Sequence, residues 1–113
     1  MLRGVVSGEL DMEVNVMKEI RAMTGVEAGL SANAQMRIAL EAIVNNGGAA
    51  QMSDIYAAVE RQMNGAMLSE QGKASLREYV NRKAVNAGYI HPHNPADEGW
   101  RITQAGRDFL GRK

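Results

Sequence analysis

Two histidines lie close to two carboxylates near the end of the chain, and these residue types bind metals. Pro92 separates His91 from His93, and Asp97 and Glu98 follow shortly afterwards. On a strand the two imidazoles would point to one face, and zinc sites combine histidine with carboxylates. However, proline weakens a strand, and the chain has 2 histidines in all, so a third imidazole is missing. The pattern disfavours a metal site, and we expect no cofactor.

The residue types needed for catalysis are also poorly placed. The chain has 113 residues and 0 cysteines, which excludes disulfides, cysteine-ligated zinc and thiol chemistry. Gly47-Gly48 is not followed by the Lys-Ser/Thr pair of a phosphate-binding loop. The carboxylates are scattered, without a spacing that pairs them on one element. The sequence therefore predicts a protein that is not an enzyme.

The most promising polar side chains lie on a helix predicted over residues 69–87. On a helical wheel its outer side and flanks carry groups that can hydrogen-bond to DNA bases: Gln71, Ser75, Arg77, Asn81 and Arg82. Asparagine and glutamine can pair with adenine, and arginine with guanine. Lys73 and Lys83 lie nearer the buried side, from which they would reach phosphates. The face is suited to DNA, although an ordinary solvated helix carries similar residues.

Two residues on the same face fit DNA less well. Glu78 could accept a hydrogen bond from a cytosine amino group, but it would repel phosphates, and Val85 is apolar. Both favour an alternative in which this face binds another protein.

Charge is distributed unevenly along the chain, although the formal net charge is zero. Residues 1–60 carry 4 Lys/Arg and 8 Asp/Glu, whereas residues 61–113 carry 9 and 5. A basic second half favours an anionic partner, although such asymmetry also arises by chance in a small domain.

Hydrophobic spacing predicts the helices that would position these side chains. Residues 9–24 predict a helix whose apolar residues cover more than half of its circumference. Such a helix is either wedged into its own fold or used for dimerisation or docking. A further helix is expected after a cap at Ser31 or Asn33, and another over residues 53–63 after a cap at Ser53. The buried sides expected for these two helices are Met36, Ala39, Leu40, Ile43 and Val44, and then Ile55, Tyr56, Val59 and Met63.

The long helix and the elements around it complete the predicted order. Ser69 is expected to cap the helix and Gly88 to end it, with Leu76, Val80, Ala84 and Ala87 on the buried side. Residues 89–102 predict a β-hairpin with a proline-rich tip, and residues 50–52 predict a third strand beside it. Thr103 is expected to cap a last short helix. This order of elements is that of a winged helix, in which the hairpin is the wing.

On such a wing, three side chains could approach a minor groove or a phosphate. These are His91, His93 and Arg101. Wings without DNA contacts also occur, so the three residues are candidates rather than assignments.

From about Met36 to Leu110 the sequence resembles a bacterial or phage winged-helix DNA-binding domain. The resemblance rests on Ile55 and Val59, on Leu76 and Val80, and on the segments "AGYI" at 87–90 and "GWRITQAGRDFL" at 99–110. It is especially similar to the N-terminal domain of Mrr-type restriction endonucleases, in which an "aGli" strand, a Gly-aromatic strand and Thr-x-x-Gly also follow one another. The resemblance implies double-stranded DNA as the partner.

We therefore expect an α+β, mostly helical fold: a winged helix with a three-helix core and a β-hairpin wing, preceded by an extra N-terminal helix. Residues 1–30 form the extension, whose residues 10–23 are a possible homodimer contact, and residues 31–113 form the winged-helix domain. The expected function is non-catalytic DNA binding, as a transcriptional regulator or as the recognition part of a restriction or phage system. The alternative is a winged-helix protein-interaction module that does not bind DNA.

Composition and the start of the chain bear on its location. No apolar run approaches the roughly 20 residues of a membrane span, and the first residues lack the apolar core of a signal peptide. We expect a cytoplasmic protein with no membrane partner.

Overall fold

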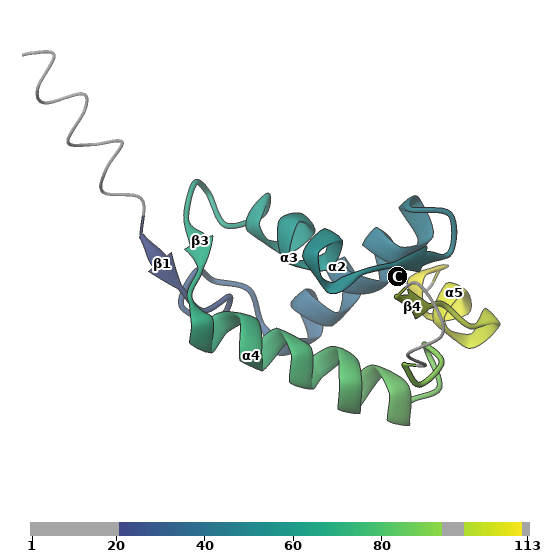
Figure 1. Cartoon of the computed structure of the whole chain (residues 1–113). Coiled ribbons are helices and arrows are strands. Elements are labelled where there is room, and N and C mark those ends of the chain that lie inside the picture. Colours follow the sequence, from purple (N-terminus) through teal and green to yellow (C-terminus); the bar gives the residue numbers. More distant parts are fainter. Residues whose placement is uncertain (1–20, 94–98, 112–113) are drawn as a thin grey trace, which may run out of the picture.

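Helices make up most of the chain that the structure describes. The structure is a computed structural model, and it describes residues 21–93 and 99–111. In chain order these residues form β1 (Ala22–Met23), α2 (Ala32–Asn45), β2 (Ala49–Ala50), α3 (Met52–Glu60), β3 (Met67–Leu68), α4 (Glu70–Glu78), the π-helical turn η1 (Tyr79–Ala84), β4 (Trp100–Arg101) and α5 (Gln104–Gly111). Figure 1 shows α4 and η1 as one long helix along one side of the molecule, with β4 and α5 beside its far end. The expected class, α+β and mostly helical, is confirmed.

α2 is the central helix of the core. The Ser31 hydroxyl oxygen accepts a hydrogen bond from the backbone N–H of Ala34 at 3.0 Å, so Ser31 rather than Asn33 is the cap. The predicted stripe is buried at Met36, Ala39, Leu40 and Ile43, and half-buried at Val44. α2 packs against α3, η1 and α5. Removal of this one stripe from water therefore holds the helices together.

α3 begins earlier than the sequence predicts, and the expected cap at Ser53 is wrong. Gln51 occupies the cap position, and its backbone N–H donates to the Asp54 carboxylate at 3.1 Å. The Asp54 carboxylate therefore satisfies a backbone N–H at the helix start. The sequence assigns the capping role to the Ser53 hydroxyl instead. The helix ends at Glu60. The residues of this region that are buried as predicted are Ile55, Val59 and Met63.

The long helix starts at its predicted cap. The Ser69 hydroxyl oxygen accepts a hydrogen bond from the backbone N–H of Gly72 at 3.0 Å. Leu76, Val80 and Ala84 are each at most 1% exposed, as the helical spacing predicts. The helical register from Ser69 to Ala84 therefore points one apolar side at the core.

Beyond Glu78 the helix widens into η1, which the sequence does not predict. A π turn takes one residue more per hydrogen-bonded turn than an α turn, so the residues after it are rotated back by about 100°. The prediction that Ala87 is buried and Val85 exposed is wrong for this reason. Ala87 is exposed, whereas Val85 is half-buried and packs against the core. Gly88, with φ of 80°, follows the helix end as expected.

A small antiparallel arrangement of three segments lies beside the end of this helix. The paired residues are Ala49↔Arg101, Ala50↔Trp100 and Ile90↔Ile102. The base of the predicted hairpin over residues 89–102 is therefore present, while residues 94–98 of its tip lie outside the described residues. The third strand is Ala49–Ala50 rather than 50–52, because Met52 already belongs to α3.

Thr103 and Gly106, the two ends of the Thr-x-x-Gly motif, hold α5 against this hairpin. The Thr103 hydroxyl oxygen accepts a hydrogen bond from the backbone N–H of Gly106 at 3.0 Å, and the Thr103 N–H donates to the Tyr89 carbonyl at 3.0 Å. A Cβ on Gly106 would overlap that same carbonyl. The Tyr89 ring also stacks on Phe109, with centroids 4.5 Å apart. Only glycine lets α5 lie this close to the hairpin.

Residues 21–30 are packed on the rest of the described chain. β1 runs parallel to β3, so the helix predicted over 9–24 does not reach its expected end. The strand pairing satisfies backbone groups in the loop that leads into α4. The Gln35 side-chain amide donates to the Leu30 carbonyl at 2.8 Å and holds the following turn against α2. Residues 9–20 of the predicted helix lie outside the described residues.

Candidate nucleic-acid interface

The α4–η1 helix carries all seven predicted helical candidates, of which Lys83 is exposed. Gln71, Asn81 and Arg82 are exposed, and Ser75 is half-buried on a flank. Leu76 is fully buried on the opposite side and fixes which side of the helix faces outward. The structure thus places these four polar side chains along the outside of a single rigid element.

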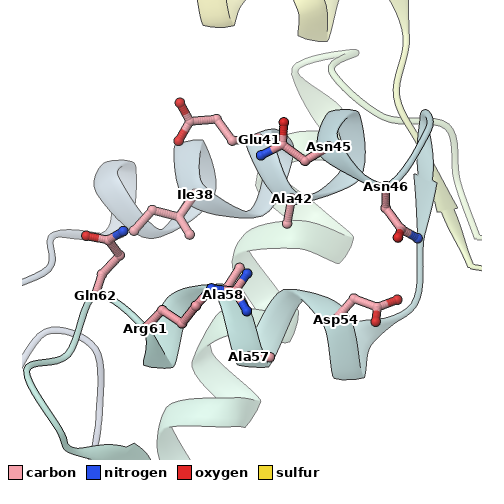
Figure 2. A pocket seen from close by; sticks show the side chains of 10 residues that line it. All are labelled: Ile38, Glu41, Ala42, Asn45, Asn46, Asp54, Ala57, Ala58, Arg61 and Gln62. Atoms are coloured by element: carbon pink, nitrogen blue, oxygen red, sulfur yellow. The ribbon is translucent and has the colours of Figure 1, made fainter.

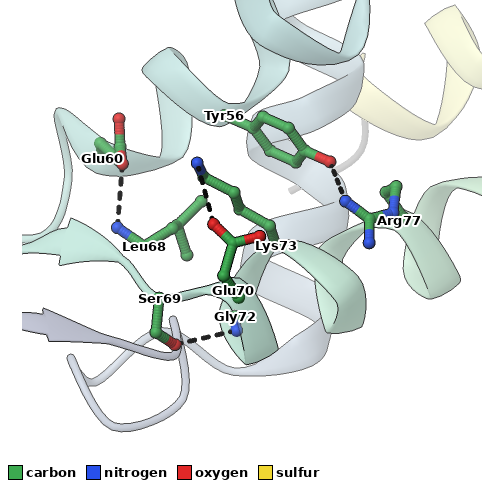
Figure 3. A network of polar contacts seen from close by, with 8 residues as sticks. All are labelled: Tyr56, Glu60, Leu68, Ser69, Glu70, Gly72, Lys73 and Arg77. Atoms are coloured by element: carbon green, nitrogen blue, oxygen red, sulfur yellow. Dashed lines mark hydrogen bonds and ion pairs between the residues drawn. The ribbon is translucent and has the colours of Figure 1, made fainter.

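The other two, Lys73 and Arg77, turn toward Tyr56 on α3 (Figure 3). An Arg77 guanidinium nitrogen donates to the Tyr56 hydroxyl oxygen at 2.6 Å. The Lys73 ammonium lies 5.6 Å from the centroid of the same ring, within the range of a cation–π contact. Residues four apart lie on one flank of a helix, so both cations reach one neighbour.

Tyr56 is the residue that sequence reasoning missed. The spacing predicts it among the buried residues of its helix, but it is half-buried and its hydroxyl is engaged by Arg77. The sequence signal that could have indicated this contact is the i, i+4 spacing of Lys73 and Arg77, which places both cations on one side of the helix. The sequence does not show which residue that neighbour is.

Two of the cations on this helix, Lys73 and Arg82, lie beside carboxylates. The Lys73 ammonium is 3.7 Å from Glu70, and the Arg82 guanidinium is 3.4 Å from Glu78. The Glu70 side chain is 94% exposed, and the Arg82 and Glu78 side chains are 73% and 58% exposed. Solvent screening makes such pairs weak, so both cations remain able to exchange a carboxylate for another anion.

The three hairpin candidates lie on adjacent segments. His91, His93 and Arg101 are all exposed. The backbone N–H of His91 donates to the Arg101 carbonyl at 3.0 Å. The His93 ring lies 4.7 Å from the ring of the buried Trp100, tilted by 44°. The hairpin base therefore presents a cation and two imidazoles on a fixed frame.

The hairpin is held directly to the end of the long helix. The Tyr89 N–H donates to the Ala84 carbonyl at 2.9 Å, and the Thr103 hydroxyl donates to the Gly88 carbonyl. These bonds fix where the hairpin leaves the helix. The candidate residues on the helix and those on the hairpin therefore lie on two elements that are hydrogen-bonded to each other.

A shallow groove of about 430 Å³ runs between α2 and α3, with α4 behind it in Figure 2. Its floor includes Ile38 and Ala42, and its rim carries Glu41, Asp54 and Arg61. The rim mixes both signs of charge, and none of the predicted site residues lines it. The groove is therefore separate from the candidate interface.

Neither a metal cluster nor a membrane-spanning helix is found in the described part of the chain. Residues 21–93 and 99–111 hold no group of three or more His, Asp or Glu side chains that could coordinate a metal ion. Asp97 and Glu98, which the sequence places near the histidines, lie outside these residues. Within the same ranges no helix combines the length and the apolar character needed to cross a membrane.

No protein-family model matches this chain, and no curated protein or solved structure matches it either. The functional argument therefore depends on the geometry and charge of the residues described above.

Proposed function

We propose that this protein binds double-stranded DNA, without catalysis, through a winged-helix domain. The observation that carries the proposal is the exposed polar side of α4–η1, with Gln71, Asn81 and Arg82 on it and the hairpin fixed at its end. In a winged helix such a helix enters the major groove, and its arginine and amide side chains read base edges.

The order and pairing of the elements support the winged helix. α2, α3 and α4 share one core, and β2 pairs with β4 beside the hairpin. In this arrangement α3 and α4 are the helix-turn-helix, and residues 89–102 are the wing. His91, His93 and Arg101 would then approach a phosphate or a minor groove.

Local charge also supports an anionic partner. The α4–η1 helix carries Lys73, Arg77, Arg82 and Lys83 against Glu70 and Glu78. Arginine and lysine beside the groove would contact phosphates, which position a protein without reading sequence. Glu78 restricts non-specific affinity, so binding depends on the correct bases more than on charge alone.

The biological role we propose follows the resemblance to the N-terminal domain of Mrr-type restriction endonucleases. The protein would act as a transcriptional regulator or as the recognition part of a restriction or phage system. A homodimer through residues 10–23 would let it bind two half-sites. β1 pairs with β3 within one chain, so such a contact would depend mainly on residues 10–20. Light scattering on the full chain tests it, and a monomer at micromolar concentration would contradict it.

The proposed function is tested by titrating a labelled duplex with the protein at several salt concentrations. We expect binding that weakens steeply as salt rises, because phosphate contacts release counterions. No binding at low salt, or an affinity that does not change with salt, would refute the proposal.

A second candidate function is a protein-interaction module. Met67 belongs to β3, and Val26 lies in the turn after β1. Both side chains are large and apolar, yet Met67 is 52% exposed and Val26 is 56% exposed. Exposed apolar residues of this kind are typical of protein contacts when they form a patch. The half-buried Val85 no longer supports this alternative. A stable complex with a purified partner, in a protein that does not bind DNA, would favour it.

A further inference from the structure

Three hydrogen-bond donors meet where α3 crosses α4, at Tyr56, Lys73 and Arg77. Figure 3 shows the tyrosine hydroxyl reaching Arg77 and the Lys73 ammonium beside the ring. The three side chains come from two helices that share the same core, so their relative positions are fixed by packing. Lys73 keeps about a third of its side chain exposed, and Arg77 is exposed. The group is therefore open to solvent.

The donors of this group exceed the acceptors around it. The Tyr56 oxygen accepts from Arg77, so its own O–H hydrogen is left to donate. Arginine has five N–H donors and lysine has three. The Glu70 carboxylate at 3.7 Å is too far from the Lys73 ammonium for a normal hydrogen bond. A ligand that complements the group must bring several acceptor oxygens and a negative charge.

The two glutamates near the group leave room for such a ligand. The Glu60 carboxylate is held toward the segment before α4, because it accepts a hydrogen bond from the Leu68 N–H at 2.9 Å. Glu70 is almost fully exposed and can turn away at little cost. An arginine hydrogen bond also polarises the tyrosine hydroxyl and strengthens it as a donor.

We infer that Tyr56, Lys73 and Arg77 form a binding site for a backbone phosphate of DNA, with Tyr56 both donating to the phosphate and holding Arg77 in place. The inference rests on the proposed function and deepens it. In a helix-turn-helix the first helix crosses the DNA backbone while the second lies in the groove. A tyrosine on α3 at this crossing would stand beside the phosphates that border the groove.

The decisive variant is Tyr56→Phe, which removes the hydroxyl and keeps the ring beneath Lys73. We expect its duplex dissociation constant to rise about three- to tenfold, equally for unrelated sequences, because a phosphate contact does not read bases. Arg77→Gln should also weaken binding and reduce the salt slope by about 0.9. Adding Tyr56→Phe to Arg77→Gln should have a smaller effect than in the wild type, because the part of the hydroxyl's effect that acts through Arg77 is already lost.

Arg82→Gln is the matched control, because Arg82 pairs with Glu78 and not with Tyr56. Its effect should multiply with that of Tyr56→Phe, as expected for independent sites. Unchanged thermal unfolding of Tyr56→Phe shows that the fold is intact. Wild-type affinity of a folded Tyr56→Phe, or effects of Tyr56→Phe and Arg77→Gln that multiply, would overturn the inference while leaving DNA binding in place.

If the wild type does not bind duplex at all, the proposed function fails and the phosphate site is tested alone. The isotope-labelled full chain is titrated with inorganic phosphate and, separately, with acetate at the same ionic strength. We expect phosphate to shift the Arg77 side-chain N–H signal in the wild type and not in Tyr56→Phe. No shift, or an equal shift with acetate, would overturn the inference.

Discussion

The two halves of the long helix hold their polar side chains in different ways. In α4, Lys73 and Arg77 are held against Tyr56 of the neighbouring helix. In η1, Asn81 and Arg82 are exposed, and Arg82 pairs with Glu78, the last residue of α4. Under the proposed function, binding through the first half would cost less side-chain entropy, because its two cations already contact Tyr56. In the proposed complex the first half would make a fixed contact with the DNA backbone, whereas the second half would adapt to bases.

The cause of the difference lies in what each half packs against. α4 contacts α3, which supplies the half-buried Tyr56, whereas η1 packs mainly against α2 through buried apolar residues. The π turn then rotates the residues after Ala84.

The largest effect is expected from Leu76→Ala, because Leu76 is fully buried on the core side of α4. We expect the free energy of unfolding to fall by about 3 kcal/mol, through lost apolar burial and the cavity left behind. Urea denaturation measures it. The exposed Gln71→Ala is the control and should stay within about 0.5 kcal/mol of the wild type. A loss near that of the control would mean that this helix is not packed as described.

The next prediction tests whether the long helix contains the π turn or is a regular α-helix throughout. Val85→Asp places a charge at a half-buried position, and Ala87→Asp places it at an exposed one. We expect Val85→Asp to lower the free energy of unfolding by about 2 kcal/mol. Ala87→Asp should change it by about 0.5 kcal/mol or less. A regular α-helix from Ser69 to Ala87 would reverse the order of the two variants.

The smallest effect concerns Glu78, the carboxylate between the two halves. Glu78→Gln should tighten duplex binding about two- to threefold at low salt, because it removes a charge that repels phosphates and pairs with Arg82. The gain should disappear as salt rises. Anisotropy titrations at low and high salt measure it. Weaker binding to some duplexes but not to others would show instead that Glu78 is itself a base contact.

Much of this fold follows from local sequence signals. Ser31 and Ser69 cap their helices as their residue types predict, and Gly88 follows the last turn of the long helix. The buried stripe of α2 follows from apolar spacing alone. These features depend on neighbours within a few residues, and such neighbours are visible in a sequence.

Other features depend on residues far apart in the chain. The parallel pairing of β1 with β3 joins residues 22–23 to 67–68, and nothing in either pair of residues indicates the other. The π turn contains no glycine or proline that would mark it. For the candidate site, sequence predicts which side chains are polar and on which helix. The contact of Arg77 with Tyr56 required the position of α3 relative to α4.

The most direct test of the central claim, that the outside of α4–η1 binds DNA, compares the wild type with the double variant Arg77→Gln/Arg82→Gln. Both proteins are titrated with one labelled duplex at several salt concentrations, after circular dichroism has shown equal folding. Each lost phosphate contact lowers the slope of log affinity against log salt by about 0.9. We predict a slope shallower by at least about 0.9 in the double variant, from the lost phosphate contact of Arg77, and a further loss of affinity from the lost base contact of Arg82. Equal slopes, or no binding by the wild type at low salt, would contradict the claim.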